Sequence, residues 1–420
     1  MPAALQRSSR LMLLALTLPT LTACARADGG TNGDRTPYLA DVLTLEQMLQ
    51  DAPEATEVLL ADPDGITVDE QGRLLVADDY CIKVFDEEGR PVGRIGRKGK
   101  GPGEFDAPMR PSAGPTGYLT VQDILWAWNL YDGEGSFLSR RNYRIEKPFQ
   151  EYIQRNHFTF TMLNRVVPYD ATDCLVDLFG FDGNLEERFH AREQLLLSSP
   201  NGLAELVQYP SRSTFRVDAQ SSNSVELQGE LLWAVTGPGR LAYVHAYHDV
   251  HWQSDGVEGG PYWRLTDLDL PAMARHTITV PFEPMRIPEA CKRLVPIYND
   301  FLGRWFEQNP LEQEILTATE FYPPVRALRA DGDLVFAFHY CPEDSAQYEL
   351  DEEEVTERWR EVDVIDLAEG RVVVRTRFPF IPDVIRDGRA WRLFQPLDDF
   401  ASVQRFRIDP RVYTSVSERH

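Results

Sequence analysis

Lysine, closely spaced cysteines and long apolar runs are all scarce in this sequence. Only five of the 43 basic residues are Lys, and the 66 acidic residues leave a formal net charge of −23. Proteins that bind nucleic acid need a basic surface, so that class is excluded. No C-x-x-C pair occurs among the five cysteines, which argues against a zinc site. Beyond residue 24 no run approaches about 18 apolar residues, so no transmembrane helix is predicted.

Motifs for catalysis and for tight metal or phosphate binding are lacking as well. The nucleophile elbow Gly-x-Ser-x-Gly does not occur, and the glycine-rich segment 97–103 lacks the Gly-Lys-Ser/Thr ending of a phosphate-binding loop. The acidic runs Glu343-Asp344 and Asp351–Glu354 lack the spacing of an EF-hand. We interpret them as solvated loop residues, so weakly bound Ca²⁺ is the only cofactor considered and no metal ligand is assigned.

The N-terminus carries the most specific signal. Arg7 and Arg10 precede the apolar run 11–18, which is too short to cross a bilayer and leads into Leu21-Thr22-Ala23-Cys24. This ending resembles a bacterial lipobox, in which a signal peptidase cuts before the cysteine and the thiol receives fatty acyl chains such as palmitate.

We therefore predict a lipoprotein signal peptide over residues 1–23, a lipid on Cys24 and a flexible tether over 24–50, in which residues 43–49 could form a short helix. An ordinary signal peptide, cut near Ala25 or Ala27, is the alternative. Because Ala rather than Asp follows Cys24, the resemblance to Gram-negative sorting signals implies anchoring in the outer membrane, on either its periplasmic or its surface face.

Segment 64–105 has the pattern of one propeller blade. β-Forming runs at 66–68, 74–77, 82–85 and 92–95 alternate with the turns 69–72 and 86–89, each of which ends in Gly. The segment resembles an NHL repeat: 65–69 match Gly-Ile-x-Val-Asp, 72–78 match Gly-x-Leu-x-Val-Ala-Asp, 84–89 match Val-Phe-Asp-x-x-Gly, and 103–105 read Gly-Glu-Phe.

Weaker blade-length copies follow in the rest of the chain, at 117–135, 158–189, 231–280, 325–378 and 382–408. The last copy has only three strands, and Glu57–Ala61 precedes the first blade without a partner. We therefore predict an all-β, six-bladed β-propeller over 51–415, closed by Glu57–Ala61 in the last blade. Seven blades, with 200–282 split in two, is the alternative.

The strand pattern is interrupted in the region 283–323. Apolar residues there recur at helical spacing: Leu294, Ile297, Tyr298, Phe301, Leu302 and Trp305. This spacing predicts an amphipathic helix of about 15–20 residues, within a helical insertion at about 284–320 whose apolar face packs on the propeller.

The lipobox, the sharp first blade and the degenerate later ones together resemble the six-bladed β-propeller lipoproteins of Bacteroidetes-like bacteria. The resemblance implies an exported propeller and brings no catalytic motif. Because propellers present variable loops on a rigid frame, we predict a binding or scaffold module for a protein, peptide or glycan rather than an enzyme. The alternative is a lactonase-like hydrolase or lyase with a metal in the channel. It needs polar ligands where the inner strands begin, near Ile66, Phe158, Leu231, Val325 and Ile385, and few stand there.

Candidate ligand-binding residues are few. On a strand, His245 and His251 point to one side and His248 to the other, so the three do not converge on a metal. His248 and Asp249 remain as candidates at a loop rim.

The four cysteines after Cys24 leave their pairing open. Cys81, Cys174, Cys291 and Cys341 are widely spaced, and four cysteines allow three sets of disulfides. Buried free thiols are an equally good interpretation.

Overall fold

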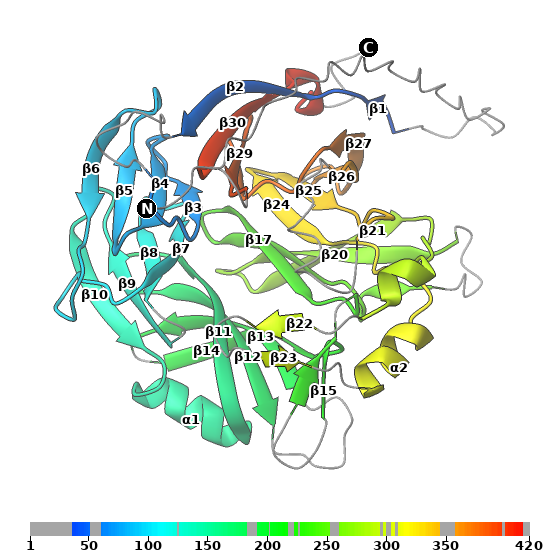
Figure 1. Cartoon of the computed structure of the whole chain (residues 1–420), viewed down its shortest axis with the longest axis horizontal. Coiled ribbons are helices and arrows are strands. Elements are labelled where there is room, and N and C mark those ends of the chain that lie inside the picture. The colour runs from blue at the N-terminus through cyan, green and yellow to red at the C-terminus, as the bar shows by residue number, and fades with distance from the viewer. Residues whose placement is uncertain are drawn as a thin grey trace, which may run out of the picture. The chain divides into compact units, whose positions relative to one another are not determined.

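The computed structural model describes residues 36–50, 60–123, 126–182, 191–200, 202–216, 222–225, 227–252, 260–294, 297–299, 304–306, 310–344, 358–396 and 400–414. The predicted signal peptide and Cys24 therefore lie outside the described residues. Residues 36–420 form one compact unit, in which six sheets are arranged as blades around a common centre (Figure 1). The predicted six-bladed propeller is confirmed.

Each blade is an antiparallel sheet whose first strand lies nearest the centre. Blade one contains β3 (Ile66–Val68), β4 (Leu74–Asp78), β5 (Cys81–Phe85) and β6 (Pro91–Ile95). Blade two contains β7 (Pro108–Ala113), β8 (Leu119–Asp123), β9 (Ala127–Tyr131) and β10 (Phe137–Asn142). Blade three contains β11 (Phe158–Pro168), β12 (Cys174–Asp182), β13 (Ala191–Ser199) and β14 (Gly202–Pro210).

The second half of the ring follows the same order. Blade four contains β17 (Leu231–Gly237), β18 (Arg240–His245), β20 (Tyr262–Asp269) and β21 (Ala274–Pro281), with the short β19 (Val250–His251) beside β20. Blade five contains β24 (Ala327–Asp331), β25 (Leu334–Phe338), β26 (Arg360–Asp366) and β27 (Arg371–Phe378). Blade six contains β28 (Val384–Arg386), β29 (Arg389–Phe394) and β30 (Ser402–Ile408), completed by β2 (Leu43–Gln50).

The first blade shows why this sequence makes tight hairpins. The Asp69 carboxylate accepts hydrogen bonds from the backbone N–H groups of Gln71 and Arg73, both at 2.9 Å. Gly72 and Gly89 close the two turns at φ of 74° and 79°, a left-handed conformation that glycine adopts without a steric penalty. The strand limits predicted for this blade are confirmed to within one residue.

The apolar core lies between the blades. Six clusters of buried side chains occupy the six seams between neighbouring sheets, for example Leu49, Ile66, Val76 and Trp391 between blades six and one. Each fully buried aliphatic side chain stabilises the fold by about 1.5–3 kcal/mol. The first strands also contact one another around the centre, β3 with β7 and β28, and β24 with β17 and β28.

The N-terminal segment closes the ring, but it is not the segment predicted. β2 pairs antiparallel with β30 from Leu43↔Ile408 to Gln50↔Ser402, so a strand replaces both the end of the predicted tether and the short helix at 43–49. Of the predicted closing strand Glu57–Ala61, Leu60 and Ala61 are not in a strand and the rest lies outside the described residues. β1 (Tyr38–Leu39) adds in parallel to the outer edge of β27.

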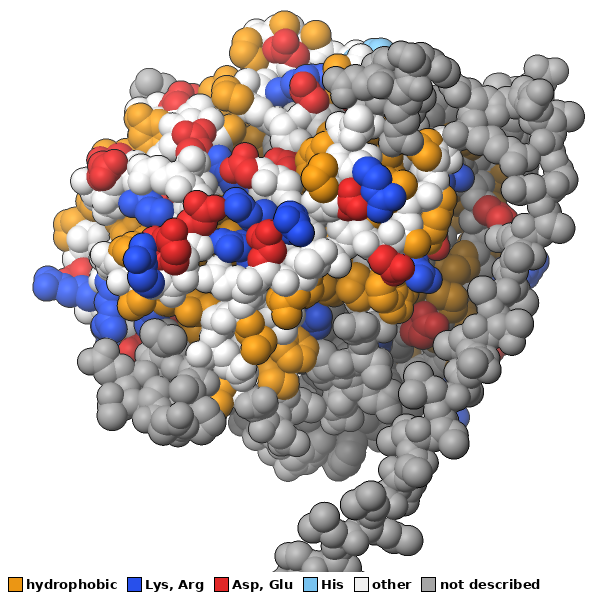
Figure 2. Space-filling view, turned by 90° about the horizontal axis from the view of Figure 1, so that it is seen from above, with side chains coloured by type: hydrophobic (Ala, Val, Ile, Leu, Met, Phe, Trp, Pro, Cys, Tyr) orange, Lys and Arg blue, Asp and Glu red, His pale blue; other side chains and the backbone are white. Residues whose placement is uncertain are grey.

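Ion pairs fasten the closing strand at the surface. The Glu46 carboxylate of β2 lies 3.4 Å from Arg389, 3.5 Å from Arg405 and 3.7 Å from Arg407. Figure 2 looks onto this side of the molecule, and acidic and basic side chains lie next to one another there. Acidic side chains on this surface are thus partly neutralised by neighbouring basic ones.

The insertion between blades four and five is placed as predicted, but the helix is not. The residues expected to be helical around Ile297–Trp305 include a β-hairpin, β22 (Ile297–Asn299) with β23 (Arg304–Phe306). The helix of the insertion is α2 (Pro310–Ala318), which buries Ile315 and Leu316. Another helix, α1 (Lys147–Arg155), joins blades two and three and was not predicted.

The seven-bladed alternative is wrong. The described residues of 202–282 supply one strand of blade three and the whole of blade four, and between them only the two-stranded β15 (Thr214–Arg216) and β16 (Ser222–Ser224). Among the described helices, none is long and apolar enough to cross a bilayer.

Candidate functional site

A cavity of about 870 Å³ lies at the centre of the propeller, chiefly against blades three, four and five, with Arg110 of blade two and Arg392 of blade six also in its wall. Basic side chains dominate the charged part of its wall. Seven arginines line it, namely Arg110, Arg165, Arg326, Arg329, Arg358, Arg360 and Arg392. Five acidic residues line it as well, namely Asp177, Glu193, Glu230, Asp344 and Asp383. The cavity is thus locally basic within a chain whose net charge is −23.

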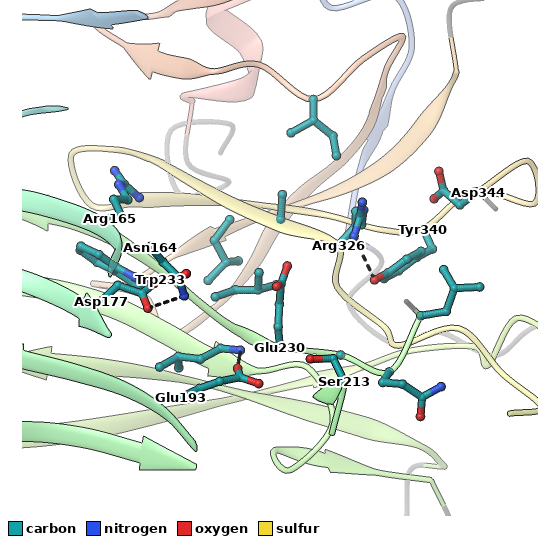
Figure 3. A pocket seen from close by; sticks show the side chains of 18 of the residues that line it. Asn164, Arg165, Asp177, Glu193, Ser213, Glu230, Trp233, Arg326, Tyr340 and Asp344 are labelled. Atoms are coloured by element: carbon teal, nitrogen blue, oxygen red, sulfur yellow. Dashed lines mark hydrogen bonds between the residues drawn. The ribbon is translucent and has the colours of Figure 1, made fainter. Parts of the chain in front are cut away.

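One side of the cavity is built on Asp177 of β12. Its two carboxylate oxygens accept hydrogen bonds from Trp233 Nε1 at 2.9 Å and from Asn164 Nδ2 at 3.1 Å. The fixed Trp233 ring then carries the Arg165 guanidinium 4.7 Å from its centroid. Figure 3 shows these four side chains together at one side of the cavity. Arg165 is therefore held by its flat face, which leaves its N–H edges directed elsewhere.

The Arg329 guanidinium of β24 is also fixed in place, by two backbone carbonyl groups. Its Nε donates to the carbonyl of Pro382 at 2.6 Å and one Nη donates to the carbonyl of Leu328 at 2.8 Å. Burial lowers the pKa of Arg329, and burial together with the charge of Arg329 lowers the pKa of Arg165 to about 10. Within the described part of the chain, neither guanidinium has a carboxylate oxygen within 4.0 Å.

On the opposite side of the cavity, charged side chains form ion pairs with one another. Asp344 forms a two-pronged ion pair with Arg360 and accepts a hydrogen bond from the Cys341 backbone N–H at 2.9 Å. Burial acts to raise the pKa of Asp344, but the hydrogen bonds and charge of Arg360 hold that pKa below its usual value. Arg326 lies beside the Tyr340 hydroxyl here, at 3.5 Å (Figure 3). Arg360 is thus held in an ion pair, whereas Arg165 and Arg329 line the cavity without one among the described residues.

A buried acid stands in the wall between these two sides. Glu193 of β13 is 5% exposed, and its Oε2 accepts a hydrogen bond from the Leu231 backbone N–H at 2.5 Å. Burial raises the pKa of Glu193 to about 8, so the carboxyl group is protonated at neutral pH.

His245 Nε2 lies 3.6 Å from the same carboxylate oxygen of Glu193. The Nδ1 atom of His245 accepts from the backbone N–H groups of Tyr247 and His248, at 3.2 and 3.3 Å. These contacts assign the ring proton to Nε2. Burial lowers the pKa of His245 to about 3, so the pair is uncharged at neutral pH.

The residues predicted from the sequence as ligand candidates have structural partners outside the cavity wall. Asp249 accepts hydrogen bonds from the Tyr209 hydroxyl and from the His245 backbone N–H, at 3.0 and 2.8 Å. His248 contacts the carbonyl of Pro210 at 2.8 Å through Nε2. These contacts hold the turn after β18 against the end of β14. His251 stacks on Tyr262 instead, with ring centroids 4.5 Å apart.

The cysteines and the acidic runs were also singled out in the sequence. Cys81, Cys174, Cys291 and Cys341 are free thiols, and all except Cys291 are buried. Of the two acidic runs, residues 351–354 lie outside the described residues. The described residues contain no group of three or more His, Cys, Asp or Glu side chains arranged to hold a metal ion.

The arginines of the cavity were not found from the sequence. They come from four blades and from two separate loops, so no local spacing marks them. The signal that could have found them is compositional. Arg supplies 38 of 43 basic residues, and its planar group suits buried recognition of anions better than Lys does.

Known proteins resemble this chain only distantly. No family model and no curated protein matches the sequence. Among solved structures, a Bacteroides vulgatus member of the DUF4221 family is 12% identical, with 87% of this chain and 98% of that chain covered and a TM-score of 0.46. A Bacteroides fragilis protein assigned to export is 12% identical over 87% and 95% of the two chains, with a TM-score of 0.40. BamB from Moraxella catarrhalis is 10% identical over 87% and 98%, with a TM-score of 0.32. Similarity at this level indicates nothing about function.

Proposed function

We propose that this chain is an exported, lipid-anchored binding module that takes a small anionic ligand, of the kind an acidic saccharide presents, into the central cavity of its propeller. The observation that carries the proposal is the charge of the cavity. Seven arginines line a volume of about 870 Å³ in a chain with a net charge of −23, and among the described residues three of them, Arg110, Arg165 and Arg329, have no carboxylate oxygen within 4.0 Å.

The size and chemistry of the cavity favour a small ligand. Pockets for small molecules commonly measure about 300–1,000 Å³ and combine apolar walls with a few fixed polar groups. Trp233, Leu231 and Phe380 supply apolar surface here, beside the fixed guanidinium of Arg165. A folded protein partner would contact only the rim of the cavity. Of the partners predicted from the sequence, we therefore favour a glycan or peptide that carries a small acidic group able to enter the cavity.

A binding experiment tests this proposal directly. The full chain in detergent is titrated with glucuronate, glucose and glucosamine at constant ionic strength, and binding is followed by calorimetry and by the shift of the unfolding midpoint. We expect glucuronate alone to bind and to stabilise the fold, because only the state with bound anion balances the arginines. Equal responses to the three sugars, or no response to any, would refute the proposal.

The lipid anchor has a separate test. It is supported by the motif Leu21-Thr22-Ala23-Cys24. Cys24→Ser should move the protein from the membrane fraction to the soluble fraction, since the acylated thiol is lost. Unchanged partitioning of this variant would contradict a lipid on Cys24.

A further inference from the structure

One face of the hairpin formed by β11 and β12 in blade three carries a row of apolar side chains. Phe160 of β11 pairs with Phe181 of β12. Further along the same two strands, Met162 pairs with Phe179. Residues two apart on a strand point to the same face of the sheet, so the two pairs lie side by side. Met162, Phe179 and Phe181 also line the central cavity, and these three with Phe160 are called the apolar row below.

The rings of the apolar row contact one another and become more exposed toward one end. The ring centroids of Phe179 and Phe181 are 5.0 Å apart, and those of Phe181 and Phe160 are 5.5 Å apart, both pairs edge to face. This is an arrangement that aromatic rings prefer. Phe179 is 8% exposed, whereas Phe160 is 50% exposed. The apolar row therefore runs from the buried part of the cavity wall to the surface.

Polar side chains follow the apolar row at its buried end. Asn164, the next residue of this face on β11, donates to the Asp177 carboxylate of β12 at 3.1 Å. Asp177 also accepts from Trp233, whose ring carries the Arg165 guanidinium (Figure 3). At the rise of a β-strand, the segment from Phe160 to Asn164 spans about 13 Å. One wall of the cavity thus changes from apolar to polar over the length of a small amphiphilic molecule.

We propose that the ligand of the central cavity is an acidic sugar that carries an apolar chain, with the sugar at the polar end of this wall and the chain along the apolar row. The inference rests on the proposed function and names the class of its ligand. A sugar alone does not account for the apolar row, because none of its four side chains contains a nitrogen or oxygen atom to bond a hydroxyl group. An alkyl or acyl chain is stabilised there because it is removed from water.

The first test varies the length of the apolar chain at constant charge. Methyl, butyl and hexyl glucuronide are titrated by calorimetry into the full chain, at pH 7.5 and with the same detergent concentration in both solutions. Burial of a whole CH₂ group strengthens binding about fourfold, and the apolar row covers one side of the chain, so we expect about twofold for each CH₂ group. The affinity should then rise about eightfold from methyl to butyl and about thirtyfold from methyl to hexyl.

This series separates the inference from the proposed function. If glucuronate binds but the affinity does not rise from methyl to hexyl glucuronide, the apolar row is not a binding surface and the proposed function is kept. If neither glucuronate nor any of its glycosides binds, both are overturned.

Two variants and a matched control locate the effect. Phe181→Ala and Phe160→Ala should each lower the affinity ratio of hexyl to methyl glucuronide at least about twofold, since each removes a ring from the apolar row. Leu138→Ala should keep the ratio, because Leu138 is 41% exposed on β10 of blade two and lies outside the cavity wall. Truncation of the half-exposed Phe160 leaves the core intact, so Phe160→Ala decides if Phe181→Ala does not fold. An unchanged ratio in the variants that fold contradicts the inference.

A neutral glycoside tests whether the sugar and the chain bind together. Hexyl glucoside has the same chain as hexyl glucuronide but lacks the carboxylate. We expect it to bind at least about tenfold more weakly, because the charge-assisted hydrogen bonds of the carboxylate are lost. Equal affinities of the two hexyl glycosides would show that the chain binds independently of the acidic group and would overturn the inference.

Discussion

Glu193 makes a strong and specific prediction about pH. Its carboxyl pKa is raised to about 8 by burial, against 4.5 for an ordinary Glu. The folded state therefore holds the proton more tightly than the unfolded state, and stability falls as the pH rises from about 4.5 towards 8. At about 1.36 kcal/mol per unit of pKa, this one group should cost the fold about 3–4 kcal/mol between pH 5 and pH 8.

The substitution Glu193→Gln isolates this effect. The Gln side chain keeps an oxygen for the Leu231 N–H at the same place but cannot ionise. The difference in unfolding free energy between the variant and the unaltered chain should be small at pH 5 and grow in favour of the variant by about 3–4 kcal/mol at pH 8. Urea denaturation at pH 5, 6, 7 and 8, with the full chain in detergent, measures both curves.

The stability contribution of His245 also depends on pH, with the opposite sign. Burial lowers its pKa to about 3, against 6.5 for an ordinary His, so it contributes in the opposite direction, with stability lost as the pH falls below 6.5. Both proteins contain His245, so its contribution cancels in the difference. A difference that stays constant from pH 5 to pH 8 would refute the reasoning, since Glu193 would then be ionised in the folded state as it is in the unfolded one.

Three further predictions concern the closure, the cavity wall and the thiols. Leu49→Ala should destabilise the fold by about 2–4 kcal/mol in urea denaturation because Leu49 fills the seam between blades six and one, whereas Leu45→Ala, on the same strand but 53% exposed, should cost less than about 0.5 kcal/mol; equal effects would contradict the closing register. Trp233→Phe should cost about 1–3 kcal/mol in the same assay, because it removes the N–H donor to buried Asp177, and a neutral result would show that this hydrogen bond does not stabilise the cavity wall. In protein whose Cys24 thiol is acylated, a thiol reagent should find four reactive thiols after unfolding but chiefly Cys291 in the native state, since the other three are buried; fewer than four in denaturant would indicate a disulfide.

The sequence predicted the blades because their signal is local. A strand, a turn ending in Gly and a second strand follow one another within about ten residues, as in 64–78, and the physical rules for hairpins act on that scale. The same rules predicted blade four. They did not by themselves exclude a second blade before it, which is excluded by the pairing of β14 with β13.

The errors arose where long-range pairing decides the structure. Residues 43–50 could be assigned to a helix on local grounds, but they form a strand because the free edge of β30 accepts them. The apolar residues near Ile297 have helical spacing, yet Ile297, Tyr298 and Asn299 pair with β23 in a hairpin. A periodic apolar pattern in a short segment does not distinguish these outcomes.

The candidate site could not be predicted for a related reason. Arg165 and Arg329 are separated by more than 160 residues and line one cavity because the first strands of blades three and five face one centre. The histidines drew attention because they are adjacent in the sequence, but His245 and His248 are used to fasten a turn. In a ring of blades, residues that act together come from equivalent strands rather than from neighbouring positions.

The pairing of β2 with β30 also sets the order in which the chain can be completed during biosynthesis. β2 is synthesised early but pairs with β30, the last strand of the chain, since residues 43–50 pair with 402–408. Until the ribosome has finished almost the whole polypeptide, blade six lacks an edge and the seam to blade one lacks Leu49. The ring therefore cannot close until the chain is nearly complete.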